Sequence, residues 1–137
     1  MSFTILIVDD NAFIRHSLRA CLEREPDLKV CGEAENGQVA VEKVKELNPD
    51  VVVLDWQMPV MNGLEAARQI TLIAPKTALV MLTLHSGRVV KEEALAVGIQ
   101  HVLSKSDAVP GRLIALLRKV CGLDQTDSGP SFETNLG

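Results

Sequence analysis

Several features that would place this sequence in a membrane, secreted or nucleic-acid-binding class are missing from it. No apolar run approaches the roughly 18 residues that cross a membrane, and the first residues carry no basic leader or cleavage site. The formal net charge is −4, so no excess of lysine and arginine favours nucleic acid as a partner. We therefore expect a cytoplasmic protein without a membrane partner.

Cysteine is also scarce. The three cysteines, Cys21, Cys31 and Cys121, are odd in number and far apart in the chain. This spacing fits neither a disulfide framework nor a zinc site. We expect three buried free thiols.

What the sequence does contain is a regular alternation of predicted strands and helices. Its 137 residues, 47% of them apolar and 23% charged, suit one domain with a sizeable core. Short apolar runs predict strands at 3–8, 28–31, 51–54, 78–82 and 100–103. Helical spacing, with glycine and proline signals at the ends, predicts helices at 11–24, 37–47, 64–73, 87–97 and from 110 or 111 to about 120 or 121.

Five strand–helix units in series predict an α/β fold, with a single parallel sheet covered by helices on both faces. Right-handed crossovers favour a doubly wound, flavodoxin-like sheet of order 2-1-3-4-5 with five helices. We assign residues 1–123 to this domain. Residues 124–137 begin with a linker-like run and lack periodicity, so we expect a flexible linker or tail there.

Three acidic residues follow two of the predicted strands. Asp9 and Asp10 come after residues 5–8, and Asp55 comes after residues 51–54. Ligands of parallel sheets bind at the carboxyl ends of the strands. If these strands are neighbours, three carboxylates meet there and repel one another unless a cation lies among them. The pattern therefore predicts a hard divalent metal, best matched by Mg²⁺.

Two more residues belong to the same edge of the predicted sheet. Thr83 closes the fourth strand, and Lys105 follows the fifth. A hydroxyl and an ammonium group beside carboxylates and a metal are typical of a site that binds a phosphoryl group. A carboxylate nucleophile in such a site would form an aspartyl phosphate.

With these residues in place, the sequence closely resembles the receiver domain of bacterial two-component response regulators. The resemblance covers about residues 3–121, and the segment from Asp55 to Gly63 is its most specific part. The segments that carry it are Val8-Asp9-Asp10, Leu54-Asp55-Trp56-Gln57-Met58-Pro59-Val60-Met61-Asn62-Gly63, Leu82-Thr83 and Leu103-Ser104-Lys105.

The resemblance implies a phosphorylation-dependent switch that assists its own phosphotransfer and autodephosphorylation, rather than a conventional enzyme. Asp55 would accept a phosphoryl group from a sensor histidine kinase or a phosphotransfer protein. Mg²⁺ would be held by Asp55, by Asp10 directly, by Asp9 through water and by the backbone carbonyl of Gln57.

The same resemblance implies how the signal would leave the site. Thr83 would move toward the phosphoryl group. Lys105 would pair with a phosphoryl oxygen, and with Asp55 before phosphorylation. The surface of the fourth helix, fifth strand and fifth helix would then change and control a partner.

Three positions depart from the family pattern. Leu84 stands where a small residue is usual, and we expect it to narrow access to Asp55. Val102 replaces the aromatic switch residue, so the usual aromatic rotation is unavailable. Ser106 replaces the common proline after the lysine, and a cis peptide bond is not expected there. The Lys105-Ser106-Asp107 run is more similar to regulators of the NarL/FixJ kind, which are transcription factors.

Neighbours of the site have expected roles as well. We expect Gln57 and His85 to position or exclude the water that attacks the phosphoryl group. Trp56, beside Asp55, should change its fluorescence when Mg²⁺ or beryllofluoride binds. His16 and His101 are predicted to be surface or structural residues.

Other functions remain open at this point. An interaction module that keeps the fold without phosphorylation would be compatible with Leu84 and Val102. A haloacid-dehalogenase-like phosphotransferase would need an acid two residues after Asp55, where Gln57 stands. A dinucleotide-binding fold would need a glycine-rich turn in place of Asp9-Asp10.

The sequence does not identify the downstream partner or domain on which such a switch would act. Fourteen residues at 124–137 are too few for a DNA-binding module. The chain is therefore either a stand-alone regulator that acts through protein contacts or part of a longer transcription factor that reaches DNA through a further domain, and the linker-like composition favours the second. The resemblance also makes a homodimer through the fourth and fifth helices plausible. The candidate contacts are Val89, Val90, Leu95 and Val97, of which several must belong to the core.

Overall fold

Strands and helices alternate along the part of the chain that the computed structural model describes, namely residues 2–84, 87–105 and 110–122. The strands are β1 (Phe3–Val8), β2 (Leu28–Ala34), β3 (Val51–Asp55), β4 (Ala78–Thr83) and β5 (His101–Ser104). The helices are α1 (Ala12–Leu22), α2 (Gly37–Leu47), α3 (Gly63–Ile73), α4 (Arg88–Ala96) and α5 (Pro110–Val120). His85, Ser106 and the expected tail at 124–137 lie outside the described residues.

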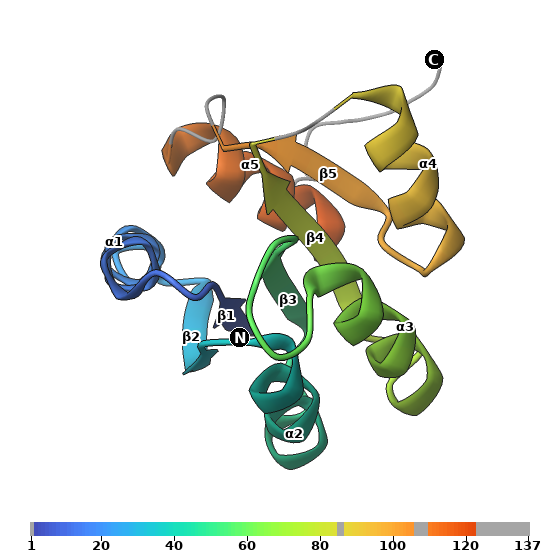
Figure 1. Cartoon of the computed structure of the whole chain (residues 1–137). Coiled ribbons are helices and arrows are strands. Elements are labelled where there is room, and N and C mark those ends of the chain that lie inside the picture. The colour runs from blue at the N-terminus through green and yellow to red at the C-terminus, as the bar shows by residue number, and fades with distance from the viewer. Residues whose placement is uncertain (1, 85–86, 106–109, 123–137) are drawn as a thin grey trace.

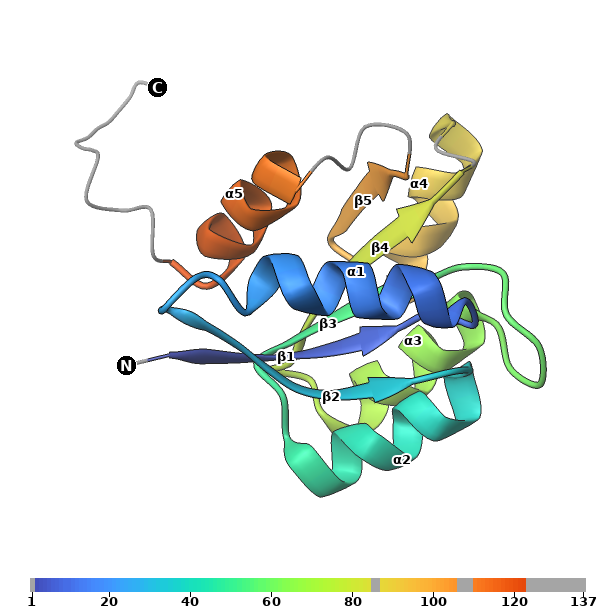
Figure 2. The same ribbon diagram turned by 90° about the vertical axis from the view of Figure 1, so that its left-hand side faces the viewer.

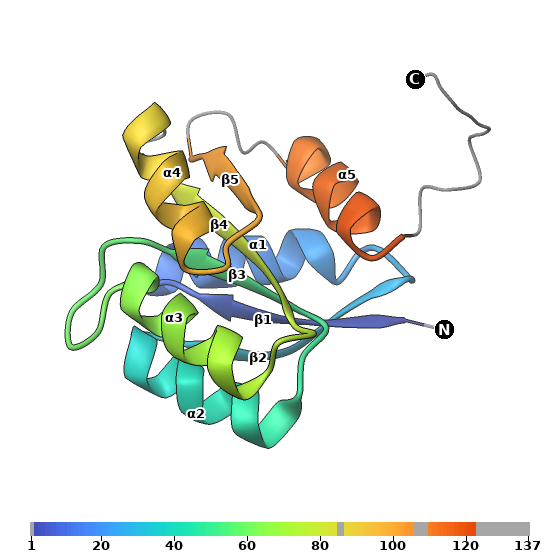
Figure 3. The same ribbon diagram turned by 90° about the vertical axis from the view of Figure 1, so that its right-hand side faces the viewer.

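The strands form one parallel sheet in the order β2-β1-β3-β4-β5, which confirms the predicted doubly wound topology. Helices α1 and α5 cover one face, while α2, α3 and α4 cover the other (Figure 1). Figure 2 shows the face that carries α1 and α5, and Figure 3 shows the opposite face. The order places β1 next to β3, as the predicted acidic site requires.

Alternating side chains of the central strands build a core on each face of the sheet. Leu6, Val52 and Leu54 pack with buried residues of α2 and α3. Ile5 and Ile7 point the other way, into a cluster with side chains of α1 and α5. Both faces of β1 and β3 are therefore buried, as their unbroken apolar runs predict.

Asparagine caps set the start of three helices that follow strands. The side chains of Asn11, Asn36 and Asn62 accept hydrogen bonds from the backbone N–H three residues ahead, at 3.1, 2.9 and 2.9 Å. Such caps satisfy a donor that the first helical turn leaves unpaired. They bring the chain into α1, α2 and α3 at the edge of the sheet where the acidic residues lie.

Strand β2 is three residues longer than predicted. Its extension pairs with the end of β1, so that Leu6 is opposite Gly32 and Val8 opposite Ala34. Gly32 and Glu33 interrupt the apolar run, which explains why the sequence pattern stops at Cys31. The extension brings Glu33 alongside α1, where Arg15 and Arg19 contact it.

The burial of the cysteines and the length of the helices both bear on expectations from the sequence. Cys21, Cys31 and Cys121 are free thiols, as predicted, but they are only partly buried, so the prediction of buried side chains was wrong. None of the helices within the described residues is long and apolar enough to cross a membrane.

Arg118 ties α5 to the turn before β2. It pairs with Asp27, with Nε 2.9 Å from Oδ2, and with Glu25. The hydrogen bond from Arg118 lowers the pKa of Asp27 below its ordinary value of 3.8, against the opposing effect of burial. The lowered pKa means that the pair stabilises the fold fully above that ordinary value and loses its effect as the pH falls through the lowered one.

We expect Arg118→Met to reduce the free energy of unfolding by about 1 kcal/mol at neutral pH, because both partners are partly screened by water. The difference from the parent protein should shrink as the pH drops below about 4. Urea unfolding at several pH values measures it. Arg88→Met is the control, since Arg88 pairs with Glu92 at 3.6 Å in an exposed position. A pH-independent loss in Arg118→Met would contradict this role for the ion pair.

Candidate functional site

The predicted site residues gather at one edge of the sheet. Asp9 and Asp10 directly follow β1, Asp55 ends β3, Thr83 ends β4 and Lys105 follows β5. Strand order brings them together, because β3 lies between β1 and β4, and β4 pairs with β5. The backbone N–H of Lys105 donates to the carbonyl of Thr83 at 2.8 Å, which joins the last two positions directly.

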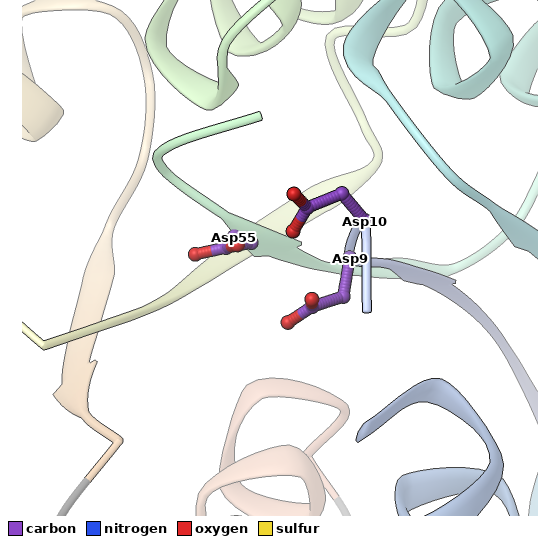
Figure 4. Close-up of side chains that lie close together, drawn as sticks. All are labelled: Asp9, Asp10 and Asp55. Carbon is purple, nitrogen blue, oxygen red and sulfur yellow. The ribbon is translucent and has the colours of Figure 1, made fainter. Parts of the chain in front are cut away.

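The three carboxylates form a compact cluster, as the sequence predicts. Each of Asp9, Asp10 and Asp55 offers an oxygen atom, and these atoms all lie within 4.8 Å of one another. The carboxylates extend on the same side of the strand ends (Figure 4). Asp9 is 2% exposed and Asp55 7% exposed, whereas Asp10 is open to solvent. Oxygen donors at this spacing, with one side open, fit a hard divalent cation.

Lys105 bridges two of these carboxylates. Its Nζ lies 3.1 Å from Oδ2 of Asp9 and 3.2 Å from Oδ1 of Asp55. The resemblance implied a pair with Asp55, but the sequence offered no sign of the equally close contact with Asp9. That contact depends on the placement of β5 relative to β1, because β3 and β4 lie between these two strands in the sheet.

The electrostatics of the cluster follow from burial and from this bridge. Burial, and then the charge of Asp9, raise the pKa of Asp55 above its usual value, while Lys105 acts in the opposite direction. Burial by itself would lower the pKa of Lys105, but the hydrogen bond to Asp9 and the charge of Asp55 outweigh it and raise that pKa. Lys105 is therefore a fixed positive charge between two buried acids.

A small cavity opens beside Asp55. It has a volume of about 120 Å³ and is lined by Asp55, Gln57, Thr83, Leu84 and Lys105. A water molecule occupies roughly 30 Å³ in the liquid, so the cavity can admit a small polyatomic group. Its lining offers a carboxylate, a hydroxyl and an ammonium group, which together suit an anion that reacts with the carboxylate.

Leu84 and Val102 can now be placed. Leu84 lines the cavity and is 70% exposed, so it forms an apolar rim rather than a buried plug. Val102 is partly buried and packs against the core on the side of α2, α3 and α4. How these side chains affect the reaction stays a prediction. His16 and His101 are absent from the described lining of this cavity.

The loop after Asp55 is shaped by close backbone contacts. The N–H of Gly63 donates to the carbonyl of Trp56 at 2.6 Å, and Gly37 donates to Met61 at 2.9 Å. A Cβ atom on Gly63 would lie 2.2 Å from the carbonyl oxygen of Asp55. Gly63 is therefore needed for a steric reason that the sequence alone shows only as a turn signal. The loop holds Gln57 at the cavity.

Val60, an exposed residue of this loop, has an unusual backbone conformation. Its φ is 70°, and the N–H of Met61 donates to the carbonyl of Pro59 at 2.7 Å. A hydrogen bond between the two residues that flank Val60, with a positive φ at Val60 itself, defines a γ-turn. Such a turn is rare for a β-branched residue. The Met58-Pro59 signal in the sequence marks this loop, although it does not predict the turn type.

Arg15 contacts the site and was missed by the sequence interpretation. Its Nη1 donates to the backbone carbonyl of Asp9 at 2.7 Å, and its Nε donates to Glu33 at 3.0 Å. The available signal was its place one turn into a helix that starts just after Asp10. The partner Glu33 was hidden because β2 was predicted to end at Cys31.

Comparison with known proteins assigns the chain to a family. Residues 5–118 match the response regulator receiver domain, so the chain belongs to this family. Receiver domains serve phosphorylation-based two-component signalling, which agrees with the acidic cluster and its lysine. The hydrolase and dinucleotide-binding alternatives have no support from this match.

Individual relatives come from more than one branch of the family. The chain is 44% identical over 104 residues to a protein-glutamate methylesterase/protein-glutamine glutaminase of Methanosarcina acetivorans, covering 75% of this chain and 30% of that protein. It is 38% identical over 120 residues to the chemotaxis protein CheY of Thermotoga maritima, covering 88% and 98%. The chain thus spans about a third of the methylesterase and nearly all of the chemotaxis protein.

A solved structure supplies a relative of a third kind. A two-component response regulator of the LuxR family from Aurantimonas superposes with a TM-score of 0.82 at 29% identity, covering 89% of this chain and 87% of that one. The receiver family is therefore confirmed. The narrower similarity to NarL/FixJ regulators stays a prediction, since relatives of other kinds match as well.

Proposed function

We propose that this protein is a signalling switch that accepts a phosphoryl group on Asp55 from the histidine of a sensor kinase or phosphotransfer protein. The observation that carries the proposal is the cavity beside Asp55. The buried Asp55 carboxylate contacts the Lys105 ammonium group there, Thr83 lines the same cavity, and Asp9 and Asp10 lie alongside.

Transfer of the phosphoryl group needs only the Asp55 carboxylate and the phosphohistidine, and water enters in the later hydrolysis. An oxygen of the ionised Asp55 carboxylate attacks the phosphorus atom of a phosphohistidine. The P–N bond breaks and its electron pair stays on the imidazole, which leaves as a neutral ring because its other nitrogen already carries a proton, and an acyl phosphate forms on Asp55. Lys105 then exchanges its contact with Asp55 for a phosphoryl oxygen, and the Thr83 hydroxyl donates to another. Water later attacks the phosphorus atom, the O–P bond to Asp55 breaks, inorganic phosphate leaves and the carboxylate is restored, with Gln57 in the cavity lining.

Asp9, Asp10 and Asp55, with the backbone carbonyl of Gln57, would hold Mg²⁺. When bound, the ion would neutralise the carboxylates and the charge of the incoming phosphoryl group. Asp9 and Asp55 are already paired with Lys105, whereas the exposed Asp10 leaves the open side of the cluster for the cation.

The output surface in this proposal is the face formed by α4, β5 and α5. A cavity of about 340 Å³ lies there, lined by residues that include Leu95, His101, Val102 and Leu116. Phosphorylation would draw Thr83 inward and shift the population of conformations of this face. Because Val102 stands in place of the aromatic switch residue, the shift would proceed without rotation of an aromatic side chain.

Homodimerisation through this face belongs to the same proposal. Val89 and Leu95 are exposed on α4 and are suitable contacts. Val90 is buried, and Val97 packs against the core, so these two candidates from the sequence are not available as contacts.

The downstream partner depends on what accompanies the receiver in the cell. The relatives include a full-length match to a chemotaxis protein and partial matches to longer proteins. We propose that the chain acts in the cytoplasm, either through protein contacts or on DNA through an attached output domain.

The proposal is tested by phosphorylation in vitro. Incubation with acetyl phosphate and Mg²⁺ should place one acid-labile phosphate on the protein, and Asp55→Asn should abolish it. Mass spectrometry and hydroxylamine cleavage at Asp55 measure the product. A folded protein that gains no phosphate from acetyl phosphate or from a histidine kinase would instead favour an interaction module, with Leu84 at the cavity rim as its structural support.

A further inference from the structure

Asp9 accepts hydrogen bonds at three different atoms. Its Oδ1 accepts the backbone N–H of Asn11 at 2.9 Å, and its Oδ2 accepts Lys105 Nζ at 3.1 Å. Its backbone carbonyl accepts Nη1 of Arg15 at 2.7 Å. The first two contacts orient the carboxylate. The third contacts the planar peptide group that joins Asp9 to Asp10.

Arg15 is itself fixed in place. Its backbone N–H donates to the carbonyl of Asn11 at 3.0 Å, in the first turn of α1. Its Nε donates to Oε1 of Glu33 at 3.0 Å, and its side chain is 15% exposed. A guanidinium group is planar with donors in a fixed fork, so a partner at Nε sets the direction of Nη1.

Glu33, which accepts the hydrogen bond from Arg15, is itself held in a fixed position. It lies on β2, next to β1, and its second oxygen accepts Nη1 of Arg19 at 2.9 Å. Burial would raise the pKa of Glu33, but the hydrogen bonds from Arg19 and Arg15 outweigh it and lower that pKa. Glu33 therefore carries its charge at neutral pH, and the Arg15–Glu33 pair is a charge-assisted contact.

These contacts form a path from the sheet edge to the exposed acid of the cluster. The carbonyl oxygen of Asp9 and the nitrogen of Asp10 belong to one rigid peptide plane. Rotation of that plane would carry the Asp10 side chain away from the oxygens of Asp9 and Asp55. Arg15 resists the rotation, whereas the contacts of Asn11 and Lys105 act on the carboxylate of Asp9 alone.

We propose that Arg15 is a positioning residue for the cation site: anchored by Glu33, it fixes the Asp9–Asp10 peptide so that Asp10 faces the other two carboxylates. This inference rests on the proposed function, because it concerns the same cation. Arg15 does not contact the cation or the phosphoryl group. It acts through the backbone.

The test is Mg²⁺ affinity, measured by titration of Trp56 fluorescence with MgCl₂ and by the increase in unfolding free energy that Mg²⁺ produces. Arg15→Gln should weaken Mg²⁺ binding about tenfold, in the range typical for outer contacts of metal ligands. At saturating Mg²⁺ its phosphorylation by acetyl phosphate should return close to the parent rate, because the reacting groups are unchanged.

Two further variants separate positioning from charge and from general stability. Arg15→Lys keeps the charge but loses the fork, so it should bind Mg²⁺ as weakly as Arg15→Gln. Arg19→Gln removes the other arginine on Glu33 without touching Asp9, so its Mg²⁺ affinity should match that of the parent protein even if it is less stable.

Parent-like affinity in Arg15→Gln, full affinity in Arg15→Lys, or an equal loss in Arg19→Gln would each overturn the inference. Failure of the proposed function is a different result. In that case the parent protein itself would neither bind Mg²⁺ nor accept phosphate, whatever the variants do.

Discussion

Lys105→Met is expected to slow phosphorylation of Asp55 by about a hundredfold, the usual effect of removing one donor that stabilises charge in a transition state. Lys105 is the cation that contacts both Asp9 and Asp55 in the described site. Without the ammonium group, one positive charge fewer offsets the repulsion between the phosphoryl oxygens and the two buried carboxylates. Methionine keeps the length of the apolar stem, so the change tests the ammonium group.

Rates of acetyl phosphate-dependent phosphorylation at saturating Mg²⁺ measure this effect. Lys45→Met is the matched control, because Lys45 is an exposed residue in the last turn of α2. The control should react at the parent rate. An unchanged rate in Lys105→Met, together with complete loss in Asp55→Asn, would show that Lys105 does not assist the transfer.

Gly63→Ala is expected to lower the free energy of unfolding by about 3 kcal/mol, at the upper end of typical overpacking costs. The added Cβ would meet the carbonyl oxygen of Asp55 at 2.2 Å and the Cα of Trp56 at 3.0 Å. Both are backbone atoms and cannot rotate away. The loop must therefore move, and Asp55 and Gln57 must move with it.

Urea unfolding with and without Mg²⁺ measures the damage to the fold and to the site together. Gly87→Ala is the control, since a Cβ there meets nothing within 4 Å and Gly87 has an ordinary φ of −70° at the start of α4. The control should lose no more than about 1 kcal/mol, the cost of alanine in place of glycine at this N-cap position. Equal, small effects of the two substitutions would contradict the steric role of Gly63.

The site combines two opposing electrostatic demands. Three carboxylates close together repel one another, and burial of two of them adds a desolvation cost. Lys105 offsets part of that cost before any cation binds. The same arrangement leaves Asp10 exposed, so the cluster keeps an open side for a cation while the buried acids stay oriented by the protein.

The contact between Arg15 and Glu33 could not be predicted from the sequence. The two residues are 18 positions apart, and the acidic one lies in a stretch that the apolar pattern excluded from β2. Their contact arises only when β2 continues beside β1 as far as Ala34. No local spacing rule predicts such a pair, because the register of neighbouring strands decides it.

The order of strands and helices, the parallel sheet and the place of the site residues at strand ends could all be predicted from the sequence. Those site residues are Asp9, Asp10, Asp55, Thr83 and Lys105. These features depend on short-range signals, namely β-branched runs, helical spacing and turn residues, which act over a few neighbouring positions. Three contacts came from the structure and not from the sequence: Lys105 bridges two acids, Arg15 reaches the Asp9 carbonyl and Gly63 lies against the backbone of Asp55. Those contacts join residues on different elements, so they depend on packing and strand register, which local sequence does not encode.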